Sequence, residues 1–397
     1  MSRPHALGDS HNFGRRVSLT EERVHKPRTL LWEWLLLAAE SPLRRLLDEA
    51  AERDGLGPDA FGFLPTLEFF EPHVRRGGQV ERAQLEPIAA LDAAGKQALA
   101  VTVGRSLALW SWLGVADLHW ENLILGVDRR GRTVFGPLDI EMILADLARP
   151  TETKLLPDAD PEYAELCRHA AGVRRVLPYL GKPLAAADLA PMASAYLSTL
   201  ACLDRHASDI AAVFAALPGL REAPIRILLR STAEYANASA PSLWPPLLEA
   251  EREQLARRDI PYFFRLYGQP GIHYFGDESL TELKRLPLSG DVPQLDPLLR
   301  LSRGLRSPSR KRLRVEGLFT LLGAFDHPSL SGHHEHEGLT LTFQRRTLIA
   351  RLPDGEELES RRDLSAFVGS VYLSCGCGEV HSVFVPQVTV CSGLPSA

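Results

Sequence analysis

The sequence lacks the features that place a protein in a membrane or outside the cell. Its longest apolar run, LLWEWLLLAA, is interrupted by Glu33 and ends at Glu40, well short of the roughly 20 residues that span a bilayer. The first residues, MSRPHALGDSHNFG, contain no apolar segment typical of a signal peptide. Five cysteines in 397 residues, an odd number, fit a reducing compartment better than a disulfide framework. These absences predict a cytoplasmic protein without a membrane span.

An excess of positive charge is also missing. The net charge of −5 and the pI near 6.2 argue against a nucleic-acid or anionic-membrane partner. The basic run SRKRLR, from Ser309 to Arg314, is short and leads into apolar residues, which indicates the solvated face of a helix. Hydrophobic and charged residues make up 45% and 24% of the chain, as in globular proteins, and its length suggests two or three domains.

The spacing of apolar residues predicts a mixed α+β chain. In the first 140 residues we expect two strands, one or two helices, a buried helix and a strand–turn–strand unit, at residues 15–26, 29–55, 95–113 and 123–140. Ala- and Leu-rich sequence from Asp158 to Leu217 predicts further helices, and PPLLEAEREQLARRDIPYFF predicts one that ends at Pro261. After about Pro328, alternating apolar and polar residues predict a β-rich element.

Two short polar segments have the composition of a phosphoryl-transfer site. GVADLHWENLILG begins at Gly114, and LDIEMIL follows after the predicted strand–turn–strand unit. Their polar residues are Asp117, His119, Asn122, Asp139 and Glu141. Phosphoryl transfer needs a carboxylate that accepts the proton of the attacking hydroxyl, and an Asn and an acid that hold Mg²⁺. Lys26 is the best-placed phosphate-binding lysine, and polar residues gathered at strand ends without a shared role are the alternative.

Further segments, in the same order along the chain, resemble the N-terminal dehydratase domain of class II lanthionine synthetases. They are GDSHNFGRRV, VHKPRTLLWEWL, the two polar segments above, and IRILLRSTAEY followed by RRDIPYFF. The resemblance covers residues 8–264. It implies an α+β, kinase-like fold of two lobes, similar to lipid kinases.

The resemblance also implies an activity. Such an enzyme uses ATP and Mg²⁺ to phosphorylate Ser and Thr of a ribosomally made precursor peptide, and then eliminates the phosphate to leave dehydroalanine or dehydrobutyrine. Asp117 would act as the base for the hydroxyl, with His119 beside it, and Lys26 would contact phosphate. The metal ligands implied are Asn122 and Asp139, with Glu141 in support.

The remaining motif positions concern the surroundings of the site and the elimination step. The resemblance assigns Asp9, His11, Arg226 and Thr232 to these roles. Eliminating phosphate leaves a dianion, which a permanently charged, bidentate arginine is suited to bind. Arg230 could share that role, and a surface ion pair is the alternative for it.

The chain also departs from the family pattern. The GDSH motif lies almost at the start of the chain, where members of the family carry a long preceding region, so we expect that part to be missing or supplied by a second protein. The family's cyclase domain, with its Cys-His-Gly zinc motif, has no counterpart in the sequence. No thioether rings are therefore expected from this chain alone, and a partner would have to supply cyclisation or leader recognition.

Two segments near the C-terminus contain residues that bind metals. Cys375, Cys377, His381 and Cys391 could form a Cys₃His zinc site, although buried cysteines in strands are the more frequent explanation. GHHEHEG, from Gly332 to Gly338, is interpreted as a solvated loop with weak metal affinity at most.

Taken together, the sequence predicts a reduced small lobe at 1–94, a helical large lobe at 95–325 and a β-rich element at 326–397. The favoured function is a stand-alone peptide dehydratase. One alternative is a phosphotransferase that stops at the phosphorylated product, with a peptide or a small molecule as acceptor. Another is a non-catalytic peptide-binding protein, against which the joint presence of Lys26, Asp117, Asn122 and Asp139 argues.

Overall fold

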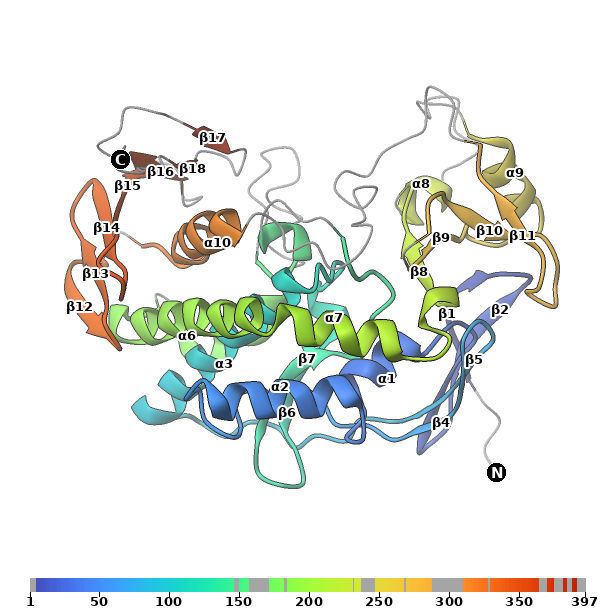
Figure 1. The fold of residues 1–397 in the computed structure, drawn as a ribbon, viewed down its shortest axis with the longest axis horizontal. Helices are drawn as coiled ribbons and strands as arrows, with labels where there is room; N and C mark the ends of the chain where they lie inside the picture. Colours follow the sequence, from blue (N-terminus) through green and yellow to red (C-terminus); the bar gives the residue numbers. More distant parts are fainter. Residues whose placement is uncertain are drawn as a thin grey trace.

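The computed structural model of the chain combines helices and sheets, so the predicted α+β class is confirmed. It describes residues 5–145, 150–156, 171–181, 184–230, 232–236, 247–267, 269–287, 310–327, 329–363, 370–374, 381–383 and 388–390. The N-terminal sheet lies at one end of the long axis of the molecule and the β12–β15 strands lie at the other, with long helices between them (Figure 1).

Antiparallel strands from the first 81 residues form a five-stranded sheet in the order β1-β2-β3-β5-β4. Their bounds are β1 His5–His11, β2 Arg15–Leu19, β3 Arg23–Lys26, β4 Phe69–His73 and β5 Gly77–Glu81. Strands β2 and β3 are the two predicted within 15–26. Strand β1 is not among the predicted elements because its Gly, Asp and Ser have low β propensity; pairing with β2 holds it in place.

Helices α1 (Leu31–Leu37) and α2 (Pro42–Arg53) occupy the helical region predicted at 29–55. The chain leaves α1 at Ala38, which has an extended backbone. Ser41 then caps α2 by accepting a hydrogen bond from the Arg44 amide, and Pro42 occupies the first turn. These local signals divide the region into two helices.

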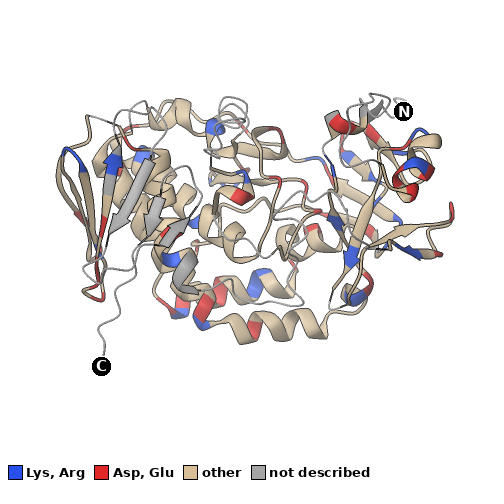
Figure 2. Ribbon diagram, turned by 90° about the horizontal axis from the view of Figure 1, so that it is seen from above, with Lys and Arg blue, Asp and Glu red and all other residues tan. Residues whose placement is uncertain are grey.

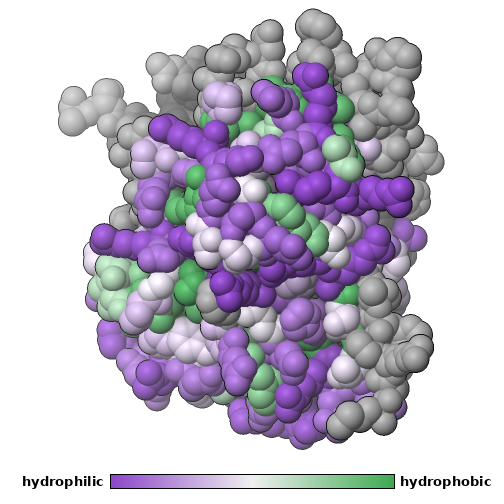
Figure 3. Space-filling model, turned by 90° about the vertical axis from the view of Figure 1, so that its right-hand side faces the viewer, coloured by the Kyte–Doolittle hydropathy of each residue, from purple (hydrophilic) through white to green (hydrophobic). Residues whose placement is uncertain are grey.

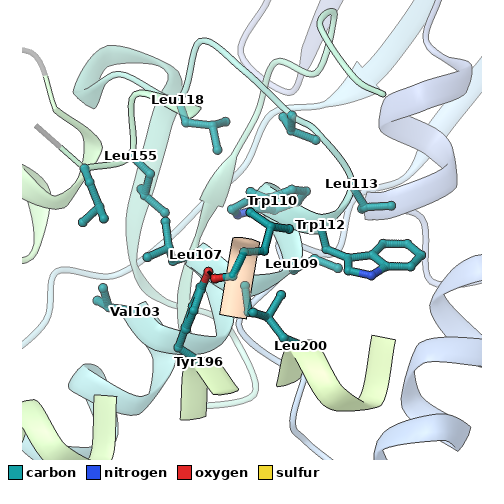
Figure 4. Packing of buried hydrophobic residues seen from close by; sticks show 14 of the residues in the cluster. Val103, Leu107, Leu109, Trp110, Trp112, Leu113, Leu118, Leu155, Tyr196 and Leu200 are labelled. Carbon is teal, nitrogen blue, oxygen red and sulfur yellow. Dashed lines mark hydrogen bonds between the residues drawn. The ribbon is translucent and has the colours of Figure 1, made fainter. Parts of the chain in front are cut away.

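Helices α3 (Ala93–Trp112) and α6 (Ala186–Arg205) pack together in the centre, and α10 (Arg310–Ala324) packs against α6. Gly104 permits the close approach, because a Cβ at this position would lie 2.1 Å from the carbonyl oxygen of Met192. Tyr196 lies among the buried side chains of this core, and its hydroxyl donates to the carbonyl of Leu313 over 2.8 Å (Figure 4). Helix α3 confirms the buried helix predicted at 95–113.

Helix α6 is also long and apolar enough to cross a membrane by length and composition. However, 72% of its apolar window is buried inside the structure, as expected of a core helix. It is weak evidence for a membrane span, and the expected cytoplasmic location stays a prediction.

Strands β6 (Leu123–Val127) and β7 (Thr133–Pro137) form the hairpin predicted at 123–140. In its turn, the carboxylate of Asp128 accepts hydrogen bonds from the amides of Arg130 and Arg132. The hairpin follows the 3-10 helix η1 (Trp120–Asn122) and leads to Asp139. It therefore connects the two polar segments identified in the sequence.

A second antiparallel sheet, in the order β11-β10-β9-β8, is not predicted from the sequence. Its strands are three or four residues long, too short for a clear alternation: β8 Pro224–Ile227, β9 Phe263–Leu266, β10 His273–Phe275 and β11 Leu283–Arg285. The predicted helix ending at Pro261 is shorter than expected, since α9 spans Glu249–Ala256. The other helical elements are η2 Pro150–Thr153, η3 Gly172–Arg175, α5 Leu177–Leu180, α7 Ala207–Ala216, η4 Leu220–Glu222 and α8 Thr232–Ala236.

The β-rich C-terminal element is confirmed as a five-stranded sheet, β12-β13-β14-β15-β16, and a separate pair, β17-β18. Their bounds are β12 Gly332–His336, β13 Leu339–Phe343, β14 Thr347–Arg351, β15 Glu357–Asp363, β16 Ser370–Ser374, β17 His381–Val383 and β18 Val388–Val390. GHHEHEG is therefore not a loop, because its first five residues pair with β13 as the edge strand β12. Of the proposed zinc ligands, Cys375, Cys377 and Cys391 lie outside the described residues, as does the side chain of His381.

The described surface is mainly polar. Lys and Arg are interspersed with Asp and Glu over the elements visible in Figure 2, in agreement with the weak net charge. The end of the molecule that carries the first two sheets is mostly hydrophilic, with small separate apolar areas (Figure 3). Trp120 is the exposed large hydrophobic residue of the described chain, at 38% exposure, and it belongs to the candidate catalytic segment.

Candidate active site

The two polar segments of the sequence lie side by side. After α3, the amide of Ala116 donates to the carbonyl of Met142 over 3.0 Å, and the amide of Ala145 donates to the carbonyl of Gly114 over 3.0 Å. Gly114 has a φ of +62°, and a Cβ on it would lie 2.1 Å from the carbonyl oxygen of Ala145. This close pairing, which requires glycine, brings the segment after α3 against the segment after Asp139.

Asp117 is held in an unusual conformation. Its φ of +66° lies in the left-handed region, which non-glycine residues seldom adopt and which is concentrated at functional sites. The side-chain amide of Asn122 donates to the carbonyl oxygen of Asp117 over 2.9 Å and to its Oδ2 over 3.3 Å. Lys154 Nζ lies 3.0 Å from Oδ1 of the same carboxylate. Asn122 and Lys154 thus fix the orientation of a partly exposed carboxylate.

His119 has a supporting position beside this carboxylate. Its Nε2 lies 3.9 Å from Oδ1 of Asp117, and its Nδ1 accepts a hydrogen bond from the Glu121 amide at the start of η1. The ring therefore caps the turn that presents Asn122. His119 is not among the residues that line the adjacent cavity.

Arg28 connects three acidic residues and is the centre of the site. Its guanidinium bonds Glu33 at 2.8 Å and Glu141 at 2.8 Å, and it also contacts Asp139. Burial favours loss of the Arg28 proton, but Asp139, Glu141 and Glu33 raise its pKa well above the usual value. Burial also acts to raise the pKa of Asp139, but Arg28 and Lys26 outweigh it and keep that pKa below the usual range. These groups are therefore ionised at neutral pH.

Lys26 ends strand β3 and is directed to Glu33 of α1. Its Nζ lies 3.0 Å from Oε1 of Glu33 and donates to the carbonyl of Leu138 over 2.5 Å. The residue is 6% exposed and does not line the cavity. The structure thus places Lys26 behind Asp139, in an ion pair, and it is Arg28, two residues later, that reaches the cavity.

Arg226 approaches the same acidic cluster from strand β8. Its backbone amide donates to the carbonyl of Glu141 over 2.9 Å, and its guanidinium lies 3.3 Å from the Glu141 carboxylate and 5.4 Å from the ring centre of Tyr262. Within the described residues its buried Nε has no hydrogen-bond partner. A buried, cationic N–H without a partner is a binding position for an anion.

His11 faces Arg226 from strand β1. Its Nδ1 lies 2.8 Å from the carbonyl oxygen of Ile260, an acceptor, so Nδ1 carries the proton and Nε2 is the basic nitrogen. Burial lowers the pKa of His11, and the positive charge of Arg226 lowers it further. His11 is therefore a neutral imidazole near pH 7, as a general base must be. Asp9, from the same strand, and Thr232, at the start of α8, also line the cavity.

The tip of the β1–β2 hairpin is fixed over the site by Asp259. This buried carboxylate accepts hydrogen bonds from the hydroxyl of Ser10 at 2.5 Å and from the amides of Phe13 and Gly14 at 2.7 and 2.9 Å. The amide of Ile260 donates to the carbonyl of Ser10 over 2.7 Å. The hairpin is thereby joined to the segment that leads into β9, which closes one wall of the cavity.

The cavity enclosed by these elements has a volume of about 410 Å³. Eight of the ten predicted site residues line it: Asp9, His11, Asp117, Asn122, Asp139, Glu141, Arg226 and Thr232. The two others, Lys26 and His119, contact members of this set through ion pairs or turns, as described above. Segments that are more than 200 residues apart in the sequence are therefore brought together at one site.

The donor groups of the cavity suit a magnesium–phosphate ligand. The oxygen atoms of Asn122, Asp139 and Glu141 are the type of ligand that Mg²⁺ prefers. Because Asn122 uses its amide nitrogen to bond Asp117, its oxygen is the atom left for a cation. Arg28 and Arg226 offer charged N–H groups for phosphate oxygens. The residues present thus fit the cofactors implied by the sequence.

Sequence reasoning missed several important residues of the site. Arg28 and Glu33 lie inside VHKPRTLLWEWL, where only Lys26 was singled out, and Tyr262 lies inside RRDIPYFF. A signal was available for Arg28 and Glu33, because charged residues flank or interrupt a strongly apolar run and must be paired when buried. Lys154 lies outside every motif, and only the fold brings it to Asp117.

Comparison with models of known protein families and with curated protein sequences gave no match for this chain.

Proposed function

We propose that this chain phosphorylates Ser or Thr side chains of a ribosomally made peptide with ATP and Mg²⁺, and then eliminates the phosphate to leave a dehydro amino acid. The observation that carries the proposal is that one cavity contains two sets of residues from distant segments. The set suited to phosphoryl transfer is Asp117, Asn122 and Asp139. The set suited to elimination is His11, Arg226 and Thr232.

The order of the elements supports a kinase-like fold. Lys26 on β3 pairs with Glu33 on the following helix α1, and protein kinases have a strand lysine and a helix glutamate paired in this way. The spacing from Asp117 to Asn122 is Asp-Leu-x-x-x-Asn, as in the kinase catalytic loop, and a hairpin then leads to Asp139. On this proposal, residues 1–94 form the small lobe and 95–325 the large lobe.

In the phosphorylation step, Asp117 accepts the proton of the peptide hydroxyl while that oxygen attacks the γ-phosphorus and ADP leaves. Asn122 and Lys154 hold the carboxylate in place through the contacts described above. Mg²⁺ bound by Asn122, Asp139 and Glu141 would neutralise charge on the nucleotide phosphates. Arg28, rather than Lys26, is the cation positioned to contact phosphate in the cavity.

In the elimination step, Nε2 of His11 removes the α-proton of the phosphorylated residue. The electrons of that C–H bond form the Cα–Cβ double bond, and the C–O bond breaks so that phosphate leaves with its electron pair. Arg226 binds the departing phosphate through its guanidinium, with the Thr232 hydroxyl as a further donor on the cavity wall. These roles explain why a neutral histidine and a cation lie on one wall.

A mass-spectrometric assay tests the proposal. The full chain is incubated with MgATP and a pool of Ser- and Thr-containing peptides, together with any short peptide encoded beside it. A gain of roughly 80 Da marks phosphorylation, and a loss of roughly 18 Da marks dehydration. Absence of both, with no Mg²⁺-dependent nucleotide binding by calorimetry, would overturn the proposal. A stable phosphopeptide as the sole product would instead indicate a phosphotransferase. Addition of a cyclase or leader-binding partner then shows whether a second protein is needed.

A further inference from the structure

A second cluster of chemically reactive side chains lies outside the cavity, where α2 meets the junction of α6 and α7 (Figure 1). Asp54 is the C-cap residue of α2, Cys202 lies in the last turn of α6, and His206 caps its C-terminus. One possible ligand atom from each of the three lies within 4.8 Å of the others. None of the three lines the catalytic cavity.

The polar atoms of this cluster are poorly satisfied. The side chains of Asp54 and His206 are each 7% exposed, and Cys202 is 2% exposed. Among the described residues, Oδ2 of Asp54 and Nε2 of His206 have no hydrogen-bond partner. Nε2 lies 3.5 Å from Oδ1 of Asp54, without the geometry of a hydrogen bond. Buried groups left in this way are costly unless a ligand binds them.

The orientation of His206 is that of a metal ligand. Its Nδ1 lies 3.3 Å from Oδ2 of Asp209, so that nitrogen carries the proton and Nε2 is a free electron-pair donor. Metal-bound histidines are commonly held by a carboxylate on their second nitrogen in this way. The Cys202–His206 spacing of four residues places the sulfur and the imidazole on one face of the helix end.

We propose that Asp54, Cys202 and His206 form a buried zinc site that joins α2 to the end of α6, with water as the fourth ligand. Zinc is the metal chosen because sulfur, imidazole and carboxylate ligands together match its preferences better than those of Mg²⁺ or Ca²⁺. Arg205, whose guanidinium lies 2.5 Å from Oδ1 of Asp54, occupies one carboxylate oxygen and leaves Oδ2 for the metal.

Binding of zinc requires the thiolate form of Cys202. Burial and the neighbouring Asp54 carboxylate raise the pKa of the thiol to about 12, so the metal-free chain has a protonated thiol at neutral pH. Zinc then displaces that proton as the Zn–S bond forms, and the proton passes to solvent. The affinity should fall as the pH is lowered, because protons compete for both the sulfur and the imidazole.

Metal analysis of the full chain tests the site. Purified protein equilibrated with zinc should retain about one equivalent per chain at this site, and cobalt reconstitution should give a sulfur-to-cobalt charge-transfer band. Cys202→Ser should abolish the band and the retained zinc. The matched control, Arg205→Gln, removes the ion pair to Asp54 but no ligand, and should keep both.

The outcomes separate a metal site from a cluster of hydrogen bonds. Loss of zinc to a chelator should lower the melting temperature of the wild type and not that of Cys202→Ser. Wild-type protein that takes up neither metal overturns the proposal, as does a Cys202→Ser variant that retains metal equally. If Cys202→Ser does not fold by circular dichroism, His206→Gln and the chelator experiment on the wild type decide. All these readouts are independent of catalytic activity.

Discussion

Arg226 and Arg230 stand four residues apart in the segment IRILLR, yet the fold gives them opposite surroundings. Arg226 faces the cavity, shares Glu141 with Arg28, and has an Nε without a hydrogen-bond partner in the described chain. Arg230 is 1% exposed, and its Nε lies 3.0 Å from Glu251, which also accepts the hydroxyl of Tyr235 over 2.8 Å. The suggestion that Arg230 shares the phosphate-binding role is therefore wrong, and it is not a surface ion pair either.

The comparison shows how a structural charge differs from one available for chemistry. In the Arg230 region, a buried cation is paired with a single buried acid, and the pair lies away from the cavity. In the Arg226 region, cations and acids are shared among several partners around an open volume, so each can exchange a protein contact for a ligand contact. Substitutions in the first region should reduce stability, and those in the second should reduce activity.

The largest effect is expected from Arg230→Ala. Removing this arginine leaves Glu251 buried without its cation, which typically costs about 3–5 kcal/mol of folding free energy. Urea denaturation of both proteins measures this loss. The double variant Arg230→Met with Glu251→Met should lose less, because no unpaired charge is left buried. A single variant as stable as the wild type would show that the pair is not structural.

Asp117→Asn should give the next largest effect, on rate instead of stability. The amide keeps the shape of the side chain but cannot accept the proton of the attacking hydroxyl, so peptide phosphorylation should fall by about 10²-fold or more. Initial rates with MgATP and peptide provide the measurement, and calorimetry should show nucleotide affinity within a few-fold of wild type. Phosphorylation at the wild-type rate would give Asp117 a purely structural role.

Much of the cavity could be predicted because its residues occur in short segments with distinctive polar spacing. Asp117, Asn122 and Asp139 flank a hairpin whose turn, at Asp128 and Gly131, is visible in the sequence. The helices around the site follow from apolar periodicity and local caps such as Ser41. Local signals of this kind act over a few residues and need no knowledge of the tertiary fold.

The remainder depends on contacts between distant segments, which no local pattern encodes. Strand β8 has four residues and forms only because it pairs with β9, 36 to 42 residues further on, and this pairing decides that Arg226 faces the cavity. Lys154 reaches Asp117 because the Leu118 amide donates to the carbonyl of Thr153. The interpretation of GHHEHEG as a loop failed for the same reason, because pairing with β13 makes it a strand.

Arg226→Ala should affect the elimination half-reaction more than phosphorylation. The phosphoryl-transfer groups remain, so phosphopeptide should still form, whereas loss of one charged donor to the leaving phosphate should slow its departure by about 10²-fold. Mass spectrometry should therefore show products roughly 80 Da heavier in place of products roughly 18 Da lighter. Arg226→Lys, which keeps the charge without the bidentate geometry, should recover part of the elimination rate. Equal loss of both half-reactions would contradict the separation of roles.

The smallest expected effect is the pH dependence due to His11. Burial and Arg226 lower the pKa of His11 from its usual 6.5, so at acidic pH the unfolded chain takes up this proton before the folded chain does. The contribution to stability is thus complete above pH 6.5 and is lost as the pH falls toward the folded-state pKa. Over the range below that pKa, elimination from a pre-phosphorylated peptide should slow about tenfold per pH unit, because only the neutral imidazole accepts the α-proton. His11→Gln should remove most of the activity and the slope. His273→Gln is the matched control, because burial also lowers the pKa of His273 but this residue does not line the cavity. An unchanged pH profile in His11→Gln would assign the proton transfer to another group and leave His11 as a support for the hairpin.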